Sequence, residues 1–369
     1  MSLRDRLKSE AGTPQAPDLY ARFGVTANPF PASSQTSNNP HLTSPADDEA
    51  MTRIIGFLRD HKSQVVVVEG TQGVGKTNFL NYFESEIQDA LSDLPGYYVV
   101  RYLADPEASF EGTIRRLFQE LGTDHILRLS MELNKNSAPI DVCRSHDMRA
   151  ALASLSRSPG DEELAKLLMD WLLGLRLLKS HRERLDVQFR LDTVESKTAA
   201  LRDLVLVSSD ADVLEGIFLL LDELEKQDGV LGPTAVVRYL SAMRAIIDAL
   251  PNYLFMMIAV TPDAMRRYSA ALPAFRSRLQ NQITLLPLSD VGQAGELARF
   301  YLANAKAEGK RVRGAARAGT SELVTDAQIV EAFEELRRVA ERRGDSGVRQ
   351  REFLHQLYKI AEDAIQRAV

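Results

Sequence analysis

Short apolar runs along the chain predict the strands of a buried sheet. These runs span residues 65–68, 96–103, 217–221, 253–260 and 283–286. β-Branched, aromatic and other apolar residues fill most of their positions, and runs of this length are typical of strands. The run at 217–221 has no polar position, which is typical of a parallel strand that is covered on both faces. The pattern therefore predicts a parallel sheet.

Between and after these runs, apolar residues recur every three or four positions, which is the pattern of amphipathic helices. The predicted helices cover residues 47–58, 76–87, 109–121, 149–155, 161–181, 198–206, 233–249, 291–305, 325–342 and 349–368. Strands that alternate with helices indicate an α/β fold. Residues 123–212 contain no strong strand run, so we interpret them as a helical insertion. Residues 309–319 are rich in Gly, Ala and Arg and are predicted to form a loop.

A phosphate-binding motif follows the first predicted strand. Residues 70–77, GTQGVGKT, fit the pattern G-x-x-x-x-G-K-[ST]. Glycines let the backbone fold around a phosphate chain, consecutive N–H groups form an anion site, and the helix start adds its positive dipole end. The motif predicts a P-loop NTPase that binds ATP. The expected ligands are Gly70, Gly73, Val74, Gly75, Lys76 and Thr77, with Lys76 at the β- and γ-phosphates and the Thr77 hydroxyl on Mg²⁺.

Two acidic residues, Asp222 and Glu223, end the apolar run at 217–221. Functional groups gather at the carboxyl ends of strands in open α/β sheets. We expect Asp222 to bind Mg²⁺, directly or through water, and Glu223 to orient and deprotonate the attacking water. An apolar run that ends in Asp-Glu is common by itself, and the phosphate loop is what gives it meaning here.

Composition places the chain among ordinary globular proteins. Of its 369 residues, 44% are apolar and 26% are charged, and no apolar run approaches the ~20 residues of a membrane span. Cys143 is the only cysteine, so an intrachain disulfide is excluded, which suits a reducing compartment. The first residues, MSLRDRLKSE, contain no signal-peptide core. We therefore expect a cytoplasmic protein without a membrane partner.

Charge is distributed unevenly along the chain. Residues 261–369 carry a net charge of +4 and the first 260 residues a net charge of −10, and 15 of the 18 cations in the basic part are Arg. These arginines indicate either solvated helix faces or a surface that faces nucleic acid or nucleotide. Arg311, Arg313 and Arg317 are candidates for DNA contacts. Because no helix-turn-helix or zinc pattern is present, such contacts would be to phosphates and would weaken with salt.

Taken together, these motifs resemble the AAA+ ATPases. Their order in the chain is that family's order: phosphate loop, Asp-Glu strand, polar-tipped strand, Arg motif and helical lid. The resemblance covers residues 28–103 and 216–369, about two thirds of the chain. The Asn28-Pro29-Phe30 segment resembles the replication-initiator-like and transposition-regulator ATPases. The long helical insert, residues 171–174 and the acidic string at 222–225 resemble the ATPases of BREX-type phage-defence systems.

The resemblance implies a domain organisation and further site residues. It implies an N-terminal arm (1–27), an AAA+ core (28–290) and a helical lid domain (291–369). Thr261, at the end of the fourth run, matches sensor 1, where many relatives have Asn. In the sequence FRSRL, Arg278 matches the arginine finger, with Arg276 as the alternative. Arg351 best matches sensor 2 of the lid, with Arg349 as the alternative.

The sequence is compatible with two roles for the Asn-Pro-Phe segment. Asn28 and Phe30 would either wall the adenine pocket or form a packed turn.

The function that these residues favour is an ATP-hydrolysing ATPase that oligomerises on ATP and acts on or with DNA, using ATP and Mg²⁺. An arginine finger that acts on a neighbour implies a homo-oligomer, either a ring or a filament. The alternative is a STAND-type signalling switch that acts through a protein partner. A scaffold that binds ATP without turnover fits poorly with Glu223, and a small-molecule kinase fits poorly with the Asp-Glu pair and the Arg motif.

Overall fold

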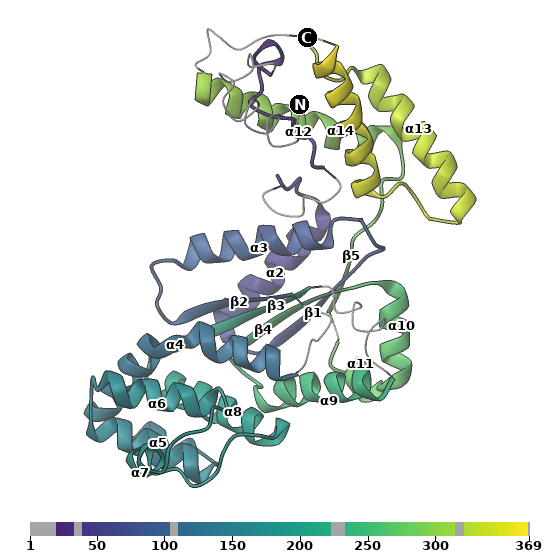
Figure 1. The fold of residues 1–369 in the computed structure, drawn as a ribbon. Coiled ribbons are helices and arrows are strands. Elements are labelled where there is room, and N and C mark those ends of the chain that lie inside the picture. Colours follow the sequence, from purple (N-terminus) through teal and green to yellow (C-terminus); the bar gives the residue numbers. More distant parts are fainter. Residues whose placement is uncertain are drawn as a thin grey trace, which may run out of the picture. The chain divides into compact units, whose positions relative to one another are not determined.

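The computed structural model describes residues 20–32, 39–103, 110–222, 233–279, 281–313 and 321–367 (Figure 1). The chain divides into two compact units. One contains the described parts of residues 1–42, 71–78 and 286–369, and the other contains those of 43–70 and 79–285. We call them the lid unit and the sheet unit, and describe each by itself.

A single five-stranded parallel sheet forms the centre of the sheet unit. Its strands are β1 (Gln64–Glu69), β2 (Tyr97–Leu103), β3 (Gly216–Asp222), β4 (Leu254–Val260) and β5 (Asn281–Thr284). They are ordered β2-β3-β4-β1-β5, and every neighbouring pair is parallel. All five predicted strands are therefore confirmed, as is the α/β fold class.

The side chains of β1 alternate between the two faces of the sheet, as the two-residue period of a strand requires. Val66 and Val68 pack into the core beneath α2 (Pro45–Asp60) and α3 (Lys76–Leu91). Val65 and Val67 belong to the core on the other face. Figure 1 shows α2 and α3 on one side of the sheet and α4 (Phe110–Lys135) and α9 (Pro233–Ala249) on the other. This double cover explains why β3 and β4 are buried at every residue.

The predicted insertion is built from helices that pack on the α4 side of the sheet. They are α5 (His146–Arg157), α6 (Glu162–Leu172), α7 (Lys179–Leu185) and α8 (Val194–Asp210). The prediction of one helix over residues 161–181 is wrong. The helix ends at Leu172 because Gly174 adopts a φ of +75°, a left-handed conformation that favours glycine and stops a helix.

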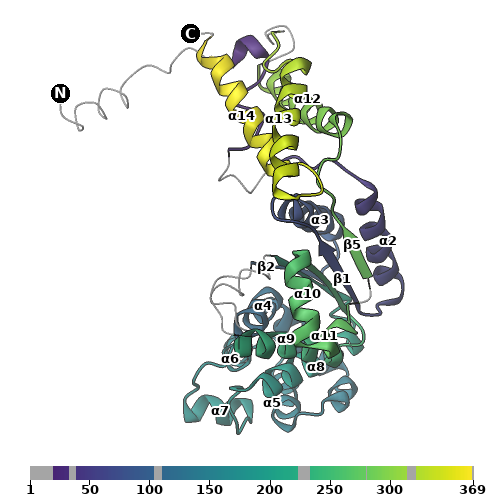
Figure 2. The same cartoon turned by 90° about the vertical axis from the view of Figure 1, so that its right-hand side faces the viewer.

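The lid unit contains α12 (Val291–Arg313), α13 (Asp326–Arg343) and α14 (Gln350–Gln366), which lie beside one another in Figure 2. The predicted loop at 309–319 is wrong for its first five residues, because α12 continues to Arg313. Position 309 in this helix requires a glycine, because a Cβ there would lie 2.0 Å from the Gly24 carbonyl oxygen. Residues 314–320 lie outside the described part of the chain.

A buried polar relay joins the sheet to the insertion. His125 on α4 is fully buried, with Nδ1 2.7 Å from the Tyr98 hydroxyl of β2 and Nε2 2.9 Å from the Ser208 hydroxyl of α8. The Arg128 guanidinium donates to the Tyr98 oxygen, so the Tyr98 proton is free to point at Nδ1. On this basis we assign the imidazole proton to Nε2, whose N–H donates a hydrogen bond to the Ser208 hydroxyl oxygen.

This relay predicts a pH dependence of stability. Burial lowers the pKa of His125 to about 3, against about 6.5 in an unfolded chain. Between these values the unfolded chain holds one more proton than the folded chain, so stability is present above pH 6.5 and falls as the pH falls. From pH 7 to pH 5, we expect His125 to remove about 2 kcal/mol from the free energy of unfolding.

Urea unfolding at both pH values checks this expectation. His125→Gln should be less stable than the wild type at pH 7, but its loss between pH 7 and pH 5 should be smaller by about 2 kcal/mol. His146→Gln is the matched control, since the His146 side chain is 81% exposed. Equal pH dependence in the His125→Gln variant and the wild type would contradict the assignment.

Candidate functional site

The segment after β1 has the backbone of a phosphate loop. The Gly70 N–H donates to the Val260 carbonyl at 3.2 Å, and the Val74 N–H closes a turn onto the Thr71 carbonyl at 3.3 Å. Gly73 and Gly75 adopt φ values of +81° and +108°, which L side chains rarely adopt. The helix α3 then begins at Lys76, as predicted.

The start of α14 packs against this loop within the lid unit. The Arg351 N–H donates to the Gly73 carbonyl at 3.0 Å. A Cβ added to Gly73 would lie 3.4 Å from the Arg351 Cβ, and one added to Gly75 would lie 2.9 Å from the Gln350 Oε1. Both glycines are therefore favoured by their backbone conformation, with α14 close beside them, and the loop fits a nucleotide phosphate.

Lys76 and Thr77 lie at the start of α3, where the sequence places the phosphate and metal ligands. Lys76 is 8% exposed, and its ammonium donates to the Thr71 carbonyl of the same loop at 3.4 Å. Thr77 is partly exposed. A loop that already holds its lysine needs little rearrangement to present that charge to an anion.

Asp222 is the last residue of β3 and is 1% exposed. Arg101, on the neighbouring strand β2, donates to Asp222 Oδ2 at 2.8 Å and to Asn81 Oδ1 at 3.2 Å. Its Nε also lies 3.7 Å from Glu84 Oε2, and burial raises the pKa of the Glu84 carboxyl. Arg101 therefore supplies a positive charge beside the buried Asp222 carboxylate.

Sequence reasoning did not assign a role to Arg101. Its signal was a single charged residue in the strand run GYYVVRYL. The partner 121 positions away was not readable from the run. Glu223, the predicted general base, lies outside the described residues.

Thr261 follows β4 and caps α10 (Pro262–Ala271), with its hydroxyl oxygen accepting from the Ala264 N–H at 3.4 Å. A hydroxyl that accepts one hydrogen bond still has its own proton to donate. The cap therefore leaves Thr261 able to donate to a phosphate oxygen, while fixing the direction of its side chain.

The two finger candidates differ in their contacts. Arg276 ends the short helix α11 (Pro273–Arg276), which Phe275 anchors in the core, and Arg278 follows it by two residues. Arg278 donates from Nε to Asp248 Oδ1 at 2.6 Å. Arg276 is exposed, and its side chain makes no hydrogen bond or ion pair with the described residues. Among the described residues, the Arg278 side chain therefore has a partner and the Arg276 side chain has none.

The two sensor 2 candidates differ in the same way. Arg349, the N-cap residue of α14, reaches Asp345 Oδ2 at 3.1 Å and Glu352 Oε1 at 3.6 Å. The Arg351 side chain is exposed and has no ion pair within the described part of the chain. The Arg351 backbone is hydrogen-bonded to the phosphate loop. Its guanidinium therefore starts from a residue that is fixed beside the loop, and it has no ion pair among the described residues.

The Asn-Pro-Phe segment is bound into the core of the lid unit. Asn28 Nδ2 donates to the Tyr358 carbonyl at 3.1 Å and to Glu362 Oε1 at 2.8 Å, and Asn28 Oδ1 accepts from the Phe30 N–H. The Phe30 ring is 1% exposed and stacks on Tyr301 with 6.2 Å between ring centroids. These contacts are those of a packed turn that fastens residues 28–30 to α12 and α14.

The basic residues near 311 are only partly described. Arg311 is exposed on α12 and pairs with Glu308 at 2.7 Å. The Arg313 side chain and Arg317 lie outside the described residues.

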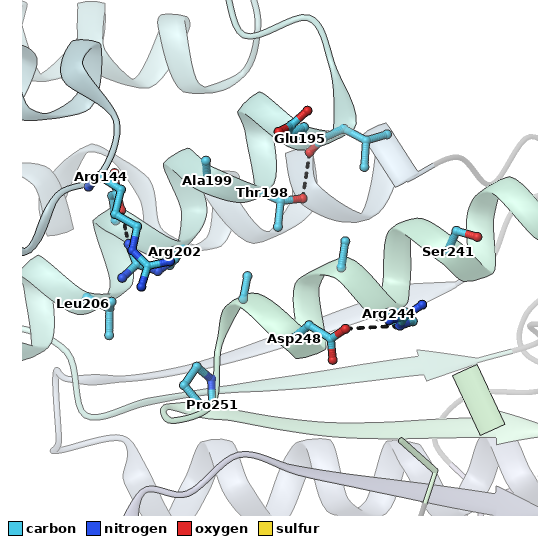
Figure 3. A pocket seen from close by; sticks show the side chains of 14 residues that line it. Arg144, Glu195, Thr198, Ala199, Arg202, Leu206, Ser241, Arg244, Asp248 and Pro251 are labelled. Atoms are coloured by element: carbon cyan, nitrogen blue, oxygen red, sulfur yellow. Dashed lines mark hydrogen bonds and ion pairs between the residues drawn. The ribbon is translucent and has the colours of Figure 1, made fainter. Parts of the chain in front are cut away.

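A groove that the sequence did not indicate lies between α8 and α9 (Figure 3). Its volume is about 780 Å³, and its lining includes Arg202 on the α8 side and Arg244 and Asp248 on the α9 side. Asp248 holds both Arg244, at 3.2 Å, and Arg278. The groove wall is therefore linked directly to Arg278.

Metal-ligand clusters and helices fit to span a membrane are both absent from the described residues. No cluster of three or more His, Cys, Asp or Glu there is arranged to hold a metal. No described helix is both long and apolar enough for a membrane span.

Comparisons with solved structures return distant likenesses. The chain matches the Orc2 protein of Aeropyrum pernix, from its ADPNP–ADP complexes, with a TM-score of 0.43 and 13% identity over 90% of this chain and 72% of that one. It matches Cdc6p of Pyrobaculum aerophilum with a TM-score of 0.38 and 14% identity over 85% and 66%. A Walker-type ATPase of Pyrococcus abyssi gives a TM-score of 0.39 and 14% identity over 89% and 73%.

A search of curated proteins finds no match. A family model described as "BREX system ATP-binding protein BrxC/D" matches residues 132–366. The match includes β3 with Asp222, the Arg motif and the lid helices, and it begins after the phosphate loop. The predicted resemblance to AAA+ ATPases of BREX systems is thereby confirmed. This chain is an ATP-binding AAA+ protein and belongs to the BrxC/D family of BREX systems.

Proposed function

We propose that the protein hydrolyses ATP, assembles into an oligomer when ATP is bound, and acts with DNA. The observation that carries the proposal is the phosphate loop, in which two positive-φ glycines and the helix start at Lys76 form the required anion site. A loop of this kind binds the nucleotide. We further propose that Asp222, Glu223, Thr261 and an arginine finger act in hydrolysis of the bound nucleotide.

In the proposed reaction, Lys76 leaves the Thr71 carbonyl and binds the β- and γ-phosphates. Thr77 and Asp222 would hold Mg²⁺, which would offset charge on the phosphate oxygens. Glu223 orients the attacking water and takes its proton. Thr261 donates to the γ-phosphate, and Arg351 reports the state of the phosphates to the lid helices.

Assembly follows from the finger arginines. Arg278, or Arg276 in its place, stabilises transition-state charge in the site of a neighbouring subunit, and such head-to-tail contacts build rings or filaments. Arg278 has to leave Asp248 for this role. Both partners are more than a third exposed, 40% and 36%, and exposed pairs of this kind contribute little stability, so the release is easy.

DNA is the proposed substrate of the assembly, contacted through phosphates by Arg311, Arg313 and Arg317. Phosphate contacts release counterions, so the binding constant should fall steeply with salt. Removing all three arginines should weaken binding to every sequence and lower the salt slope by about two to three.

Particle size measured by analytical ultracentrifugation tests the proposal. The wild type should form a larger particle with a non-hydrolysable ATP analogue and Mg²⁺, and a still larger one when duplex DNA is added. Lys76→Ala is the matched control and should keep the nucleotide-free size under all conditions. A wild type whose size ignores the analogue, or DNA binding independent of nucleotide and salt, would count against assembly and DNA action respectively.

A further inference from the structure

An exposed apolar surface lies in the part of the insertion between α6 and α8. Phe189 is 73% exposed, Leu178 is 64% exposed and Leu175 is 48% exposed. Three large apolar side chains thus lie open within fifteen residues of sequence. We call Leu175, Leu178 and Phe189, with the cations around them, the Phe189 surface.

The backbone that presents Phe189 is held on several sides. Asp147 Oδ2 accepts from the N–H groups of Gln188, at 3.1 Å, and Phe189, at 2.8 Å. The Trp171 indole donates to the Phe189 carbonyl at 2.8 Å. Val187 and Leu191 on either side are both 5% exposed. The exposed ring is therefore a fixed feature of this loop, since its neighbours are anchored and its backbone groups are bonded.

Two pockets border the Phe189 side chain. One pocket of about 480 Å³ is lined by Leu175, Leu178 and Phe189 among others, and one of about 420 Å³ also has Phe189 in its wall. Trp171 lines both pockets. An apolar side chain inserted into such a pocket would be buried against both the pocket wall and the exposed ring.

The charge around the larger pocket has one sign. Its lining includes Arg176, Lys179, Arg182 and Arg190 and contains no Asp or Glu. Arg190 is committed by its Nε to the Gly174 carbonyl at 2.7 Å, and Lys179 pairs weakly with Glu183 at 3.7 Å. Arg176 makes no hydrogen bond or ion pair with any described residue. The rim is thus basic around an apolar centre.

We propose that the Phe189 surface binds an acidic segment of a partner protein, which inserts an apolar side chain beside Phe189 and pairs its carboxylates with Arg176 and Arg182. Complementary charge selects the acidic partner and sets the register, while the apolar contact provides most of the affinity. The exposed Leu175 and Leu178 favour a protein partner over a nucleic acid. Nucleic-acid bases bind by stacking on flat aromatic faces and gain little from contact with aliphatic side chains.

An unbiased selection tests the chemistry of the partner. A phage-displayed library of random dodecapeptides is selected on the full-length wild type and depleted on full-length Phe189→Ala. Because the ring is mostly exposed and the bonds to this loop are made by its backbone, the variant should unfold at the wild-type temperature. The recovered peptides should be enriched in Asp and Glu around one or two large apolar residues.

Trp171 provides the readout for affinity, because it is the only Trp in the chain and it lines both pockets. Titration with the most enriched peptide should change its fluorescence to saturation. Phe189→Ala and the Arg176→Glu/Arg182→Glu double variant should each weaken binding about tenfold or more. Leu103→Ala, which removes an apolar side chain that is 55% exposed elsewhere on the sheet unit, should leave it unchanged.

Three results would overturn the proposal. The first is a recovered set that is not acidic, or that binds Phe189→Ala as well as the wild type. The second is saturable quenching of Trp171 by a single-stranded dT20 that competes with the peptide, which would assign the surface to nucleic acid. The third is loss of self-association in Phe189→Ala, which would assign it to a second copy of this chain. None of these results bears on ATP hydrolysis.

Discussion

Glu223→Gln is expected to bind ATP as the wild type does and to lose about 10²–10⁴-fold in the rate of hydrolysis. Gln keeps the size and hydrogen-bonding capacity of Glu but does not take a proton from water. Asp222, one residue earlier at the tip of β3, is unchanged in this variant and remains available as the proposed Mg²⁺ ligand. Binding and turnover therefore separate in this variant, and the ATP-bound oligomer should accumulate.

Phosphate release and binding of a fluorescent ATP analogue measure the two properties. Glu225→Gln is the matched control, since it neutralises the other glutamate of the same acidic string and should hydrolyse ATP normally. Unchanged phosphate release in Glu223→Gln would rule out Glu223 as the base. A wild type that releases phosphate only about once per subunit would favour the signalling-switch alternative.

Gly75→Ala is expected to weaken ATP binding about tenfold to a hundredfold. The loop places Gly75 at a φ of +108°, and a Cβ there would lie 2.9 Å from the Gln350 Oε1. A strained backbone conformation of this kind typically costs about 1–3 kcal/mol, and the loop can relieve it only by moving the N–H groups that bind phosphate. The strain is therefore expressed as lost affinity for the nucleotide.

Equilibrium binding of ATP with Mg²⁺ measures this effect, with thermal unfolding measured beside it. Gly160→Ala is the control, because Gly160 also has a positive φ, +74°, but a Cβ there would meet nothing within 4 Å. That variant should lose stability and keep its ATP affinity. Adding Gln350→Ala to Gly75→Ala separates the close contact from the backbone strain, since only the contact is relieved. Full ATP affinity in Gly75→Ala would mean that the loop does not bind phosphate in this conformation.

Local patterns predicted a large part of this fold. The β-branched run at Val65–Val68 and the apolar run before Asp222 were sufficient to place β1 and β3, because the length and composition of each run favour a buried strand. The phosphate loop was equally predictable, because its glycines are needed for backbone conformations within the motif itself. The break of the predicted helix at Gly174 was missed, because Leu175 and Leu177 continue the apolar pattern beyond the helix end.

The sequence by itself determined the fold class, the strands, the phosphate loop and the identity of Asp222 and Glu223 as the acidic pair, because each depends on residues close together in the chain. Only the tertiary structure decided the partners of the arginines. It paired Arg101 with Asp222, which is 121 positions away, and Arg278 with Asp248, and among the described residues it gave the Arg351 side chain no ion pair. It also fixed Phe189 in the open through Asp147 and Trp171. Long polar side chains reach partners that folding brings from distant segments, and no local period records that proximity.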